Sequence, residues 1–357
     1  MAQNAFGKRL FRSGSGLQQT LSPLVQRRCQ STKTVPAFTP SSSPELDQKL
    51  DRIRTELFVP MYFAEHQKRL IFRDRYRERL NQEQVKITIG NEEFALRPMN
   101  RQSLPSKREV HGAIEAMKTS QDWKNFVPLL IGSLHSKYKP KPASIEKWVR
   151  LAGKSDTLPY ILEAAKQSSK TGFSFADRAI AFRFAFELHE KAKMAAFSGE
   201  ALTAAFRYAE QAAQLMERPE HTNNEVSQDA KRQPFFIGLL TELSAARAID
   251  QAEGEDVDGK VLSYTRKLLG VWDLAALDRE LGLWYETDKF LQEIALIYSG
   301  LKMAQQVKSV AQDKTLVKSI EQRLKQLKTV AEHAVEAAPE QRREQPTLGL
   351  KEVQSIL

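Results

Sequence analysis

Reactive side chains are sparse in this sequence, and none stands at the spacing that catalysis requires. Gly153 is followed by lysine and serine as in a phosphate-binding loop, but such a loop needs another glycine five residues earlier, where Trp148 stands. His189 and Glu190 begin like a zinc-protease motif, but the second histidine of that motif is replaced by Lys193. These patterns are typical of a helix end and of an ordinary helix, so the sequence predicts neither a nucleotide site nor a zinc enzyme.

The other residues that bind metals or act as nucleophiles are equally scattered. The histidines show no i, i+4 pairs and no carboxylates at ligand spacing: His66, His111, His135, His189, His221 and His333. Cys29 is the single cysteine, which excludes thiolate zinc sites and iron–sulfur clusters. The sequence therefore predicts no enzyme, no cofactor and no metal site, and function is expected to reside in surfaces.

A first basic segment, residues 68–79, could bind the phosphates of a nucleic acid. At 100° per residue, Arg69, Arg73 and Arg77 would share one helical face, and Lys68 would lie on another. Cations four residues apart repel unless an anion neutralises them. An RNA backbone would do so, with an affinity that falls as salt rises. We predict that these four residues bind RNA; the alternative is a solvated face that nearby acids offset.

A second basic segment follows a predicted helix. Lys137, Lys139 and Lys141 alternate around Tyr138 and two prolines, and the next acidic residue is Glu146. An extended strip of cations with one aromatic ring suits RNA phosphates and an unpaired base. We predict that these three lysines and the tyrosine bind RNA; the alternative is an inter-helix loop in which the lysines only aid solubility.

The first 44 residues differ in composition from the rest of the chain. They contain no acidic residue and are rich in arginine, lysine and serine, with apolar residues at roughly helical spacing. This composition is typical of a mitochondrial transit peptide. The sequence predicts a removed transit peptide over residues 1–30 and a flexible linker over residues 31–44; the alternative is a disordered basic tail. Removing residues 1–30 lowers the net charge from +10 to about +5, with 49 basic and 44 acidic residues left.

Residues 45–105 are predicted to form basic helices and one β-hairpin. A helical run extends over residues 58–80, and then the period changes. Residues 85–89 alternate between apolar and polar, Gly90–Asn91 offers a two-residue turn, and residues 92–96 follow as a second strand. A lone hairpin is marginal in water, so this one is expected to lie on the helices, on RNA or on a partner.

The pattern is helical from residue 106 to the end. Ser106 and Glu109 have the spacing of a capping box. When the sequence is aligned with itself so that Phe126 matches Tyr160, several other apolar positions also coincide. The offset of this alignment equals the period of tetratricopeptide and pentatricopeptide repeats. Residues 106–217 are therefore predicted to form repeat-like helical hairpins, and whether the similarity is a true repeat stays open.

The remaining segments complete the predicted organisation. Residues 218–234 form a polar loop, residues 235–338 form a C-terminal helical region, and residues 339–357 form a tail. The last long helix is expected over residues 303–338, with an apolar seam along one side. No apolar stretch approaches the roughly 18 residues of a membrane span. The predicted fold class is all-α: antiparallel helical hairpins in a short solenoid, one small β-hairpin and a long C-terminal helix.

This organisation resembles a known class of protein. A transit peptide, a basic helix and hairpin, the segments Trp123–Leu130 (WKNFVPLL) and His135–Pro140 (HSKYKP), and a lysine-rich terminal helix resemble a fungal mitochondrion-specific ribosomal protein, expected in the large subunit. The resemblance covers most of the mature chain as organisation and carries no diagnostic motif. It implies a structural role at the periphery of the mitochondrial ribosome, without catalysis.

We therefore expect a structural ribosomal component of the mitochondrial matrix. Its expected partners are mitochondrial ribosomal RNA and other mitoribosomal proteins, with no small-molecule substrate. One alternative is a pentatricopeptide-like RNA-binding factor, which would need base-reading polar residues at fixed repeat positions, and no such column is visible. The other is an assembly factor for a respiratory complex, which predicts no RNA contact.

Overall fold

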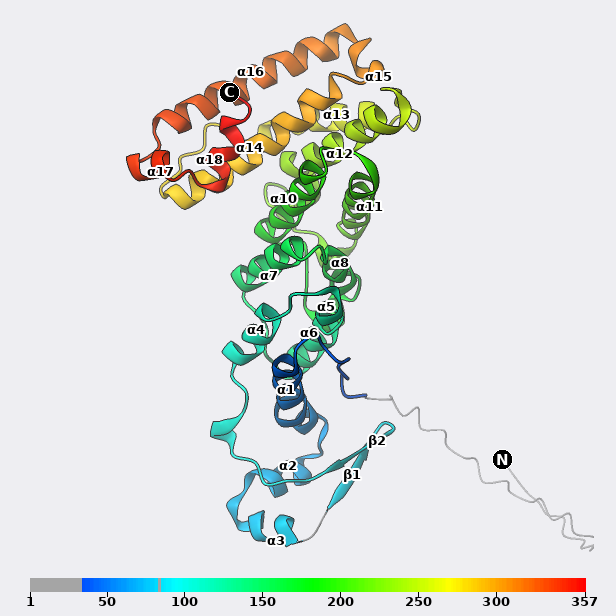
Figure 1. Ribbon diagram of the computed structural model, residues 1–357, viewed down its shortest axis with the longest axis vertical. Helices are drawn as coiled ribbons and strands as arrows, with labels where there is room; N and C mark the ends of the chain where they lie inside the picture. The colour runs from blue at the N-terminus through cyan, green and yellow to red at the C-terminus, as the bar shows by residue number, and fades with distance from the viewer. Residues whose placement is uncertain (1–33, 83–84) are drawn as a thin grey trace, which may run out of the picture.

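The computed structural model describes residues 34–82 and 85–357, so the expected transit peptide over residues 1–30 lies outside the described part. Helices dominate this part (Figure 1), which confirms the predicted all-α fold class. The α-helices are α1 (Pro44–Arg52), α2 (Glu65–Phe72), α3 (Arg77–Gln82), α4 (Lys107–Glu115), α5 (Ser120–Trp123), α6 (Phe126–His135), α7 (Pro142–Lys154), α8 (Leu158–Lys166), α9 (Ser168–Thr171), α10 (Arg178–Met194), α11 (Gly199–Leu215), α12 (Pro234–Ala252), α13 (Lys260–Gly270), α14 (Trp284–Ala304), α15 (Lys308–Ala311), α16 (Lys314–Glu336), α17 (Glu340–Glu344) and α18 (Leu348–Gln354).

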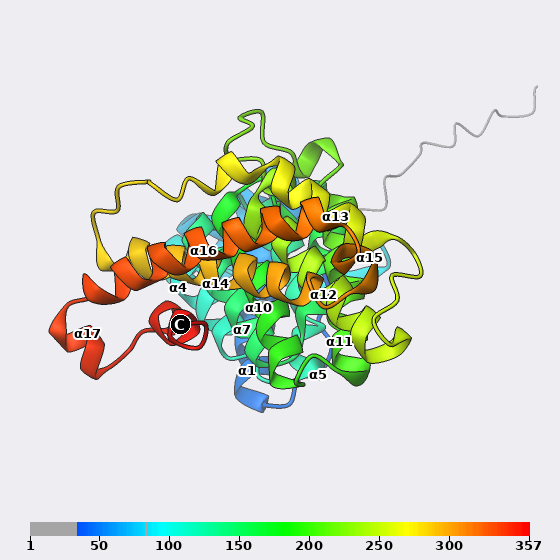
Figure 2. The ribbon, with the colours of Figure 1, turned by 90° about the horizontal axis from the view of Figure 1, so that it is seen from above.

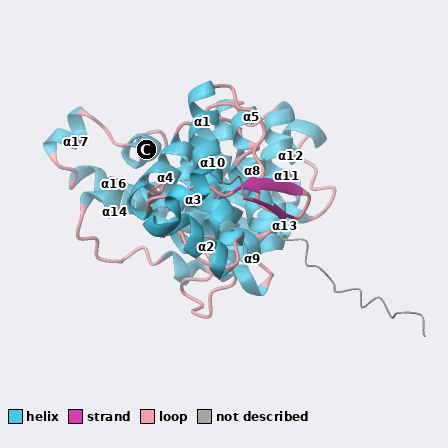
Figure 3. Cartoon of the chain, turned by 90° about the horizontal axis from the view of Figure 1, so that it is seen from below, coloured by secondary structure: helices cyan, strands magenta, loops and turns pink. Residues whose placement is uncertain are grey.

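The predicted β-hairpin is present as β1 (Lys86–Ile89) and β2 (Glu92–Ala95), an antiparallel pair in which Ile87 lies opposite Phe94. Gly90 opens the turn with a φ of 61°, a conformation that a two-residue hairpin turn needs and that glycine adopts without strain. The guanidinium of Arg54 lies over the Phe94 ring at 5.5 Å. The hairpin therefore rests on the N-terminal helices, beside α2 and α3 when seen from below (Figure 3).

The middle of the chain is a stack of helical pairs along the long axis of the molecule (Figure 1). α7 packs on α10, α10 on α11, and α11 on α12. The first helices of three successive pairs begin at residues 107, 142 and 178, which is close to a regular period, whereas the second helices begin unevenly at 126, 158 and 199. The Ser106–Glu109 capping box at the start of α4 is confirmed. True sequence repeats stay a prediction.

α12 and α14 make the most extensive contact among the described helices and join the two halves of the hydrophobic core. A Cβ on Gly300 would lie 2.5 Å from the carbonyl oxygen of Gly238 on the facing helix. The two glycines therefore let the helix backbones approach more closely than side chains would allow. From above, the C-terminal helices lie across the end of the stack (Figure 2).

The long C-terminal helix is confirmed as α16, but it begins later than predicted. Asp313 stands at its N-cap and accepts a hydrogen bond from the Leu316 backbone N–H at 3.1 Å, so the helix starts at Lys314 and not near residue 303. Its buried seam packs on α14 and consists of Leu316, Ile320, Leu324, Leu327 and Ala331. Burial of this seam against α14 accounts for the amphipathic pattern of α16.

The segment before α1 is held on the body by hydrogen bonds. The Thr39 N–H donates to Asn125 Oδ1 at 2.8 Å, and the Ser42 N–H donates to Asp122 Oδ1 at 2.7 Å. Val35 is buried in the core. The described part of the expected linker, residues 34–44, is thus packed over α5 and α6.

Candidate nucleic-acid interface

The first predicted group of cations lies around α2, at the lower end of the molecule in Figure 1. Lys68 and Arg69 lie on α2, Arg73 follows it, and Arg77 begins α3. All but the half-buried Lys68 are exposed, and Arg77 pairs with the exposed Asp74 at 3.4 Å. Their side chains are accessible to an anion but lie on three separate segments of the chain, and RNA binding by them stays a prediction.

The expectation that Arg69, Arg73 and Arg77 share one helical face is wrong. The helix ends at Phe72 because Arg73 is extended (φ −106°, ψ 124°). The Ile71 carbonyl, which a continuing helix would use, accepts the Met99 N–H at 2.8 Å instead. Tertiary contact with the segment after the hairpin thus breaks the helix that periodicity predicts.

The second predicted group lies in the loop between α6 and α7. Lys137, Lys139 and Lys141 are exposed, and Lys137 has a positive φ of 61° that turns the chain out of α6. Lys141 is the N-cap residue of α7. The three ammonium groups form no ion pair with an acid within residues 34–82 and 85–357, and the same holds for Lys68, Arg69 and Arg73. No acid of the described residues therefore neutralises these six cations, and their charge is available to a phosphate.

Tyr138 holds this loop in place. Its hydroxyl donates to the Pro105 carbonyl at 3.0 Å, its N–H donates to the Ser133 carbonyl at 2.8 Å, and its half-buried ring packs on the core. The Lys107 ammonium lies 5.6 Å from the ring centre. The ring thus has partners within the fold, which leaves less of it for a stacked base than the sequence alone suggests.

Three further cations belong to this surface and were missed in the sequence. Lys107 and Arg108 begin α4 and are exposed, and the bond from Tyr138 to Pro105 brings them beside the lysine loop. Arg101 lies over the Phe72 ring at 5.1 Å and lines, with Lys68, a hollow of about 380 Å³. No sequence signal marks them, because the fold brings together segments that are remote from one another in the chain. We call the exposed cations of residues 64–141 the cationic surface.

Charge is distributed unevenly along the chain. Residues 64–141 contain 16 basic and 9 acidic residues, a net charge of +7, whereas residues 142–357 contain 29 basic and 31 acidic residues, a net charge of −2. The excess positive charge of the mature chain is therefore concentrated in residues 64–141, which occupy the lower half of the molecule in Figure 1. Such an asymmetry favours contact of that half with an anionic polymer.

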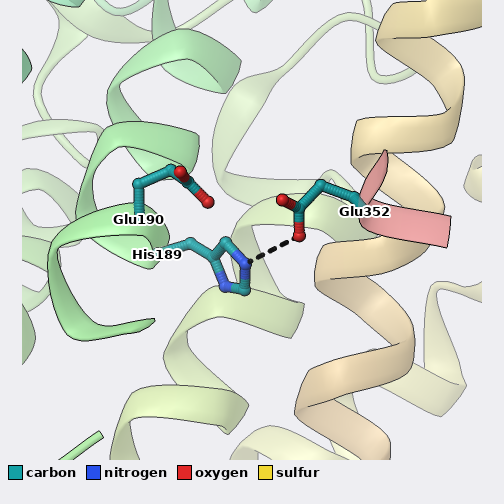
Figure 4. Close-up of side chains that lie close together, drawn as sticks. All are labelled: His189, Glu190 and Glu352. Atoms are coloured by element: carbon teal, nitrogen blue, oxygen red, sulfur yellow. Dashed lines mark ion pairs between the residues drawn. The ribbon is translucent and has the colours of Figure 1, made fainter. Parts of the chain in front are cut away.

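The sequence has no carboxylate at ligand spacing from a histidine, but the fold brings two carboxylates against His189. Two residues remote in sequence lie against its ring: Glu242 on α12, and Glu352 on α18, which Figure 4 shows beside it. Burial lowers the pKa of His189, but the two carboxylates raise it more, to about 10. The sequence could not show this cluster, because its members lie on three helices.

The features described so far define a class of protein: a helical scaffold that presents a cationic surface. In the described residues, no helix is both long and apolar enough to cross a membrane. A family model described as mitochondrial ribosomal protein mS27 matches residues 24–355, and the chain belongs to this family. It is accordingly a structural protein of the mitochondrial ribosome and not an enzyme.

A curated fungal protein supports this assignment. The small ribosomal subunit protein mS27 of Neurospora crassa is 26% identical over 310 residues, which cover 77% of this chain and 76% of that protein. The expectation of a mitochondrial ribosomal protein is confirmed. The expectation of the large subunit is wrong, because the relative is a protein of the small subunit. General features of the chain, its helices and its basic end, do not distinguish the subunits.

Proposed function

We propose that this chain is a structural component of the small subunit of the mitochondrial ribosome, placed in the matrix. It would contact ribosomal RNA through the cationic surface and neighbouring ribosomal proteins through the remaining helices. Residues 1–30 would serve as the import signal. The near-neutral charge of residues 142–357 suits contacts with proteins, which need no excess of cations.

The observation that carries this proposal is the set of exposed cations in residues 64–141, most of them without an acidic partner among the described residues. Lys137, Lys139 and Lys141 stand on a loop that Tyr138 fixes, so their charges are presented without a large loss of backbone freedom on binding. Lys68, Arg69, Arg73 and Arg77 lie around α2 and α3, at the lower end of the molecule in Figure 1. Together they offer several phosphate contacts from preformed structure.

Sedimentation tests the placement. In a sucrose gradient of a mitochondrial lysate at moderate salt, the chain should migrate with the small subunit. Migration with the large subunit, with a membrane complex after detergent, or as free protein would contradict the proposal. Membership in a ribosomal protein family favours the first outcome over a free RNA-binding factor or an assembly factor.

Charge reversal tests the RNA contact. Lys137, Lys139 and Lys141 changed together to glutamate should weaken binding of the purified chain to small-subunit ribosomal RNA at least tenfold. Because each phosphate contact contributes about 0.7–0.9 to the slope of log K against log salt, the slope should fall by about 2. Filter binding over a salt series measures both quantities.

The matched control reverses three exposed lysines elsewhere: Lys314, Lys318 and Lys325 on α16. This variant has the same net charge but leaves the cationic surface intact. It should bind RNA within about twofold of the unchanged chain. Equal losses in both triple variants would show that only overall charge matters and would remove the cationic surface from the proposal.

A further inference from the structure

A buried cluster of titratable side chains lies where α18, the last helix of the chain, meets α10. His189 and Glu190 come from α10 and Glu352 comes from α18, and Figure 4 shows the three side chains turned toward one another. One potential ligand atom from each residue lies within 4.8 Å of the other two. The cluster is remote from the cationic surface and has no part in the proposed RNA contact.

The imidazole of His189 is held in the orientation of a metal ligand. Its Nδ1 lies 2.8 and 2.9 Å from the two carboxylate oxygens of the fully buried Glu242, so Nδ1–H is the donor there. His189 is only 3% exposed, and its Nε2 has no hydrogen-bond partner while it lies 3.8 Å from Glu352 Oε2. A carboxylate behind the ring and a free nitrogen in front form the usual surroundings of a metal-binding histidine.

The second ligand is also without a hydrogen-bond partner. Glu190 Oε1 is buried and accepts no hydrogen bond, and the nearest cation, the Lys193 ammonium, lies 3.9 Å away. A buried carboxylate oxygen without a donor is costly in a stable fold. A bound cation at this position would remove that cost.

We propose that His189, Glu190 and Glu352 form a site for one divalent transition-metal ion of the zinc type, with Glu242 orienting the imidazole. Imidazole with carboxylates suits such ions, whereas Mg²⁺ and Ca²⁺ prefer oxygen ligands alone. Tetrahedral ligand atoms lie roughly 3.3 Å apart, so the two glutamate side chains rotate inward on binding. Solvent completes the coordination.

Lys193 competes with this ion. Its ammonium contacts the same Glu352 oxygen that faces His189, but the side chain is 39% exposed and can turn into solvent. The site therefore exchanges a lysine for a metal. Because Glu352 belongs to α18, the ion would fasten α18 to α10 and so stabilise the folded chain.

The test is isothermal titration calorimetry with Zn²⁺. The full chain carries Cys29→Ser, so that no thiolate competes, and is first dialysed against a chelator. One equivalent of Zn²⁺ should bind, Mg²⁺ should not compete, and the melting temperature should rise with the Zn²⁺ concentration. Glu190→Gln should weaken binding at least tenfold, and it is the safest variant because Glu190 Oε1 has no hydrogen bond to lose.

Two further variants make the result decisive. Lys193→Met should bind Zn²⁺ several-fold more tightly, because it removes the competing cation; a purely structural lysine would not have this effect. His333→Gln removes an exposed histidine that also stands beside a glutamate, on α16, and should leave binding unchanged. Absence of binding at millimolar Zn²⁺, or equal binding in Glu190→Gln and the unchanged chain, would overturn the proposal and leave a protonated histidine held by carboxylates.

Discussion

Asp122 anchors the segment before α1 to the body, and its replacement by asparagine should destabilise the protein measurably. The carboxylate is buried at the start of α5. It accepts hydrogen bonds from the Ser42 N–H and hydroxyl at 2.7 and 3.0 Å, and from the Lys118 and Thr119 N–H groups, both at 2.9 Å. Asparagine keeps the shape of the side chain but places a donor where one of these acceptors stands.

The magnitude follows from the pKa of Asp122. Burial raises this pKa, but the hydrogen bonds from Ser42, Thr119 and Lys118 outweigh burial and lower it from 3.8 to about 2. That difference corresponds to about 2 kcal/mol as an upper limit, because nearby solvent screens part of it. Since the pKa is lowered in the folded state, this stability is fully present above about pH 5 and is lost as the pH falls from about 4 toward 2.

Urea denaturation followed by circular dichroism measures the effect. At pH 7 the Asp122→Asn variant should lose roughly 2 kcal/mol of unfolding free energy or somewhat less, and the gap to the unchanged chain should narrow between pH 5 and pH 3. Glu321→Gln, an exposed change on α16, serves as the control and should have no effect. A gap that keeps its size down to pH 3 would show that the charge of Asp122 has no part in the anchor.

Three further outcomes are expected from the structure. Gly300→Ala should lower the unfolding free energy by about 2–3 kcal/mol, because the new Cβ meets the Gly238 carbonyl. Gly112→Ala, whose Cβ would have nothing within 4 Å, should stabilise α4 by up to about 1 kcal/mol. Chemical denaturation of both variants measures the difference, and equal effects would refute the close contact between α12 and α14. Burial lowers the pKa of His221, whose Nδ1 accepts the Phe175 N–H at 3.1 Å, so stability should fall as the pH drops below 6.5. His221→Asn should reduce this acid dependence in urea denaturation at pH 7 and 5.5, and an unchanged dependence would argue against it.

The prediction of elements was most successful where local signals agree. The hairpin follows from strict alternation around Gly90, and the start of α4 follows from the capping pair of Ser106 and Glu109. Prediction failed where a distant segment competes for the same backbone group. The helix after α2 is interrupted because Met99 takes the carbonyl of Ile71, a contact that periodicity alone does not reveal.

The candidate surface was likewise predictable only where its residues are close together in the sequence. The lysine loop at residues 137–141 is visible in the sequence because its cations are close together. Lys107 becomes part of that surface only through the bond from Tyr138 to Pro105, which joins two segments that are distant in the chain. Sequence reasoning therefore found the charges but not the complete surface.

By itself, the sequence determined the all-α class, the hairpin and the basic character of the N-terminal third, since these depend on periodicity, turn residues and composition. Only the tertiary structure decided where helices break and which remote side chains meet. His189, Glu242 and Glu352 illustrate the limit: each looks like an ordinary helical residue, and only the packing of α10, α12 and α18 brings them together. Contacts between distant segments depend on the packing of whole helices, and no local pattern encodes them.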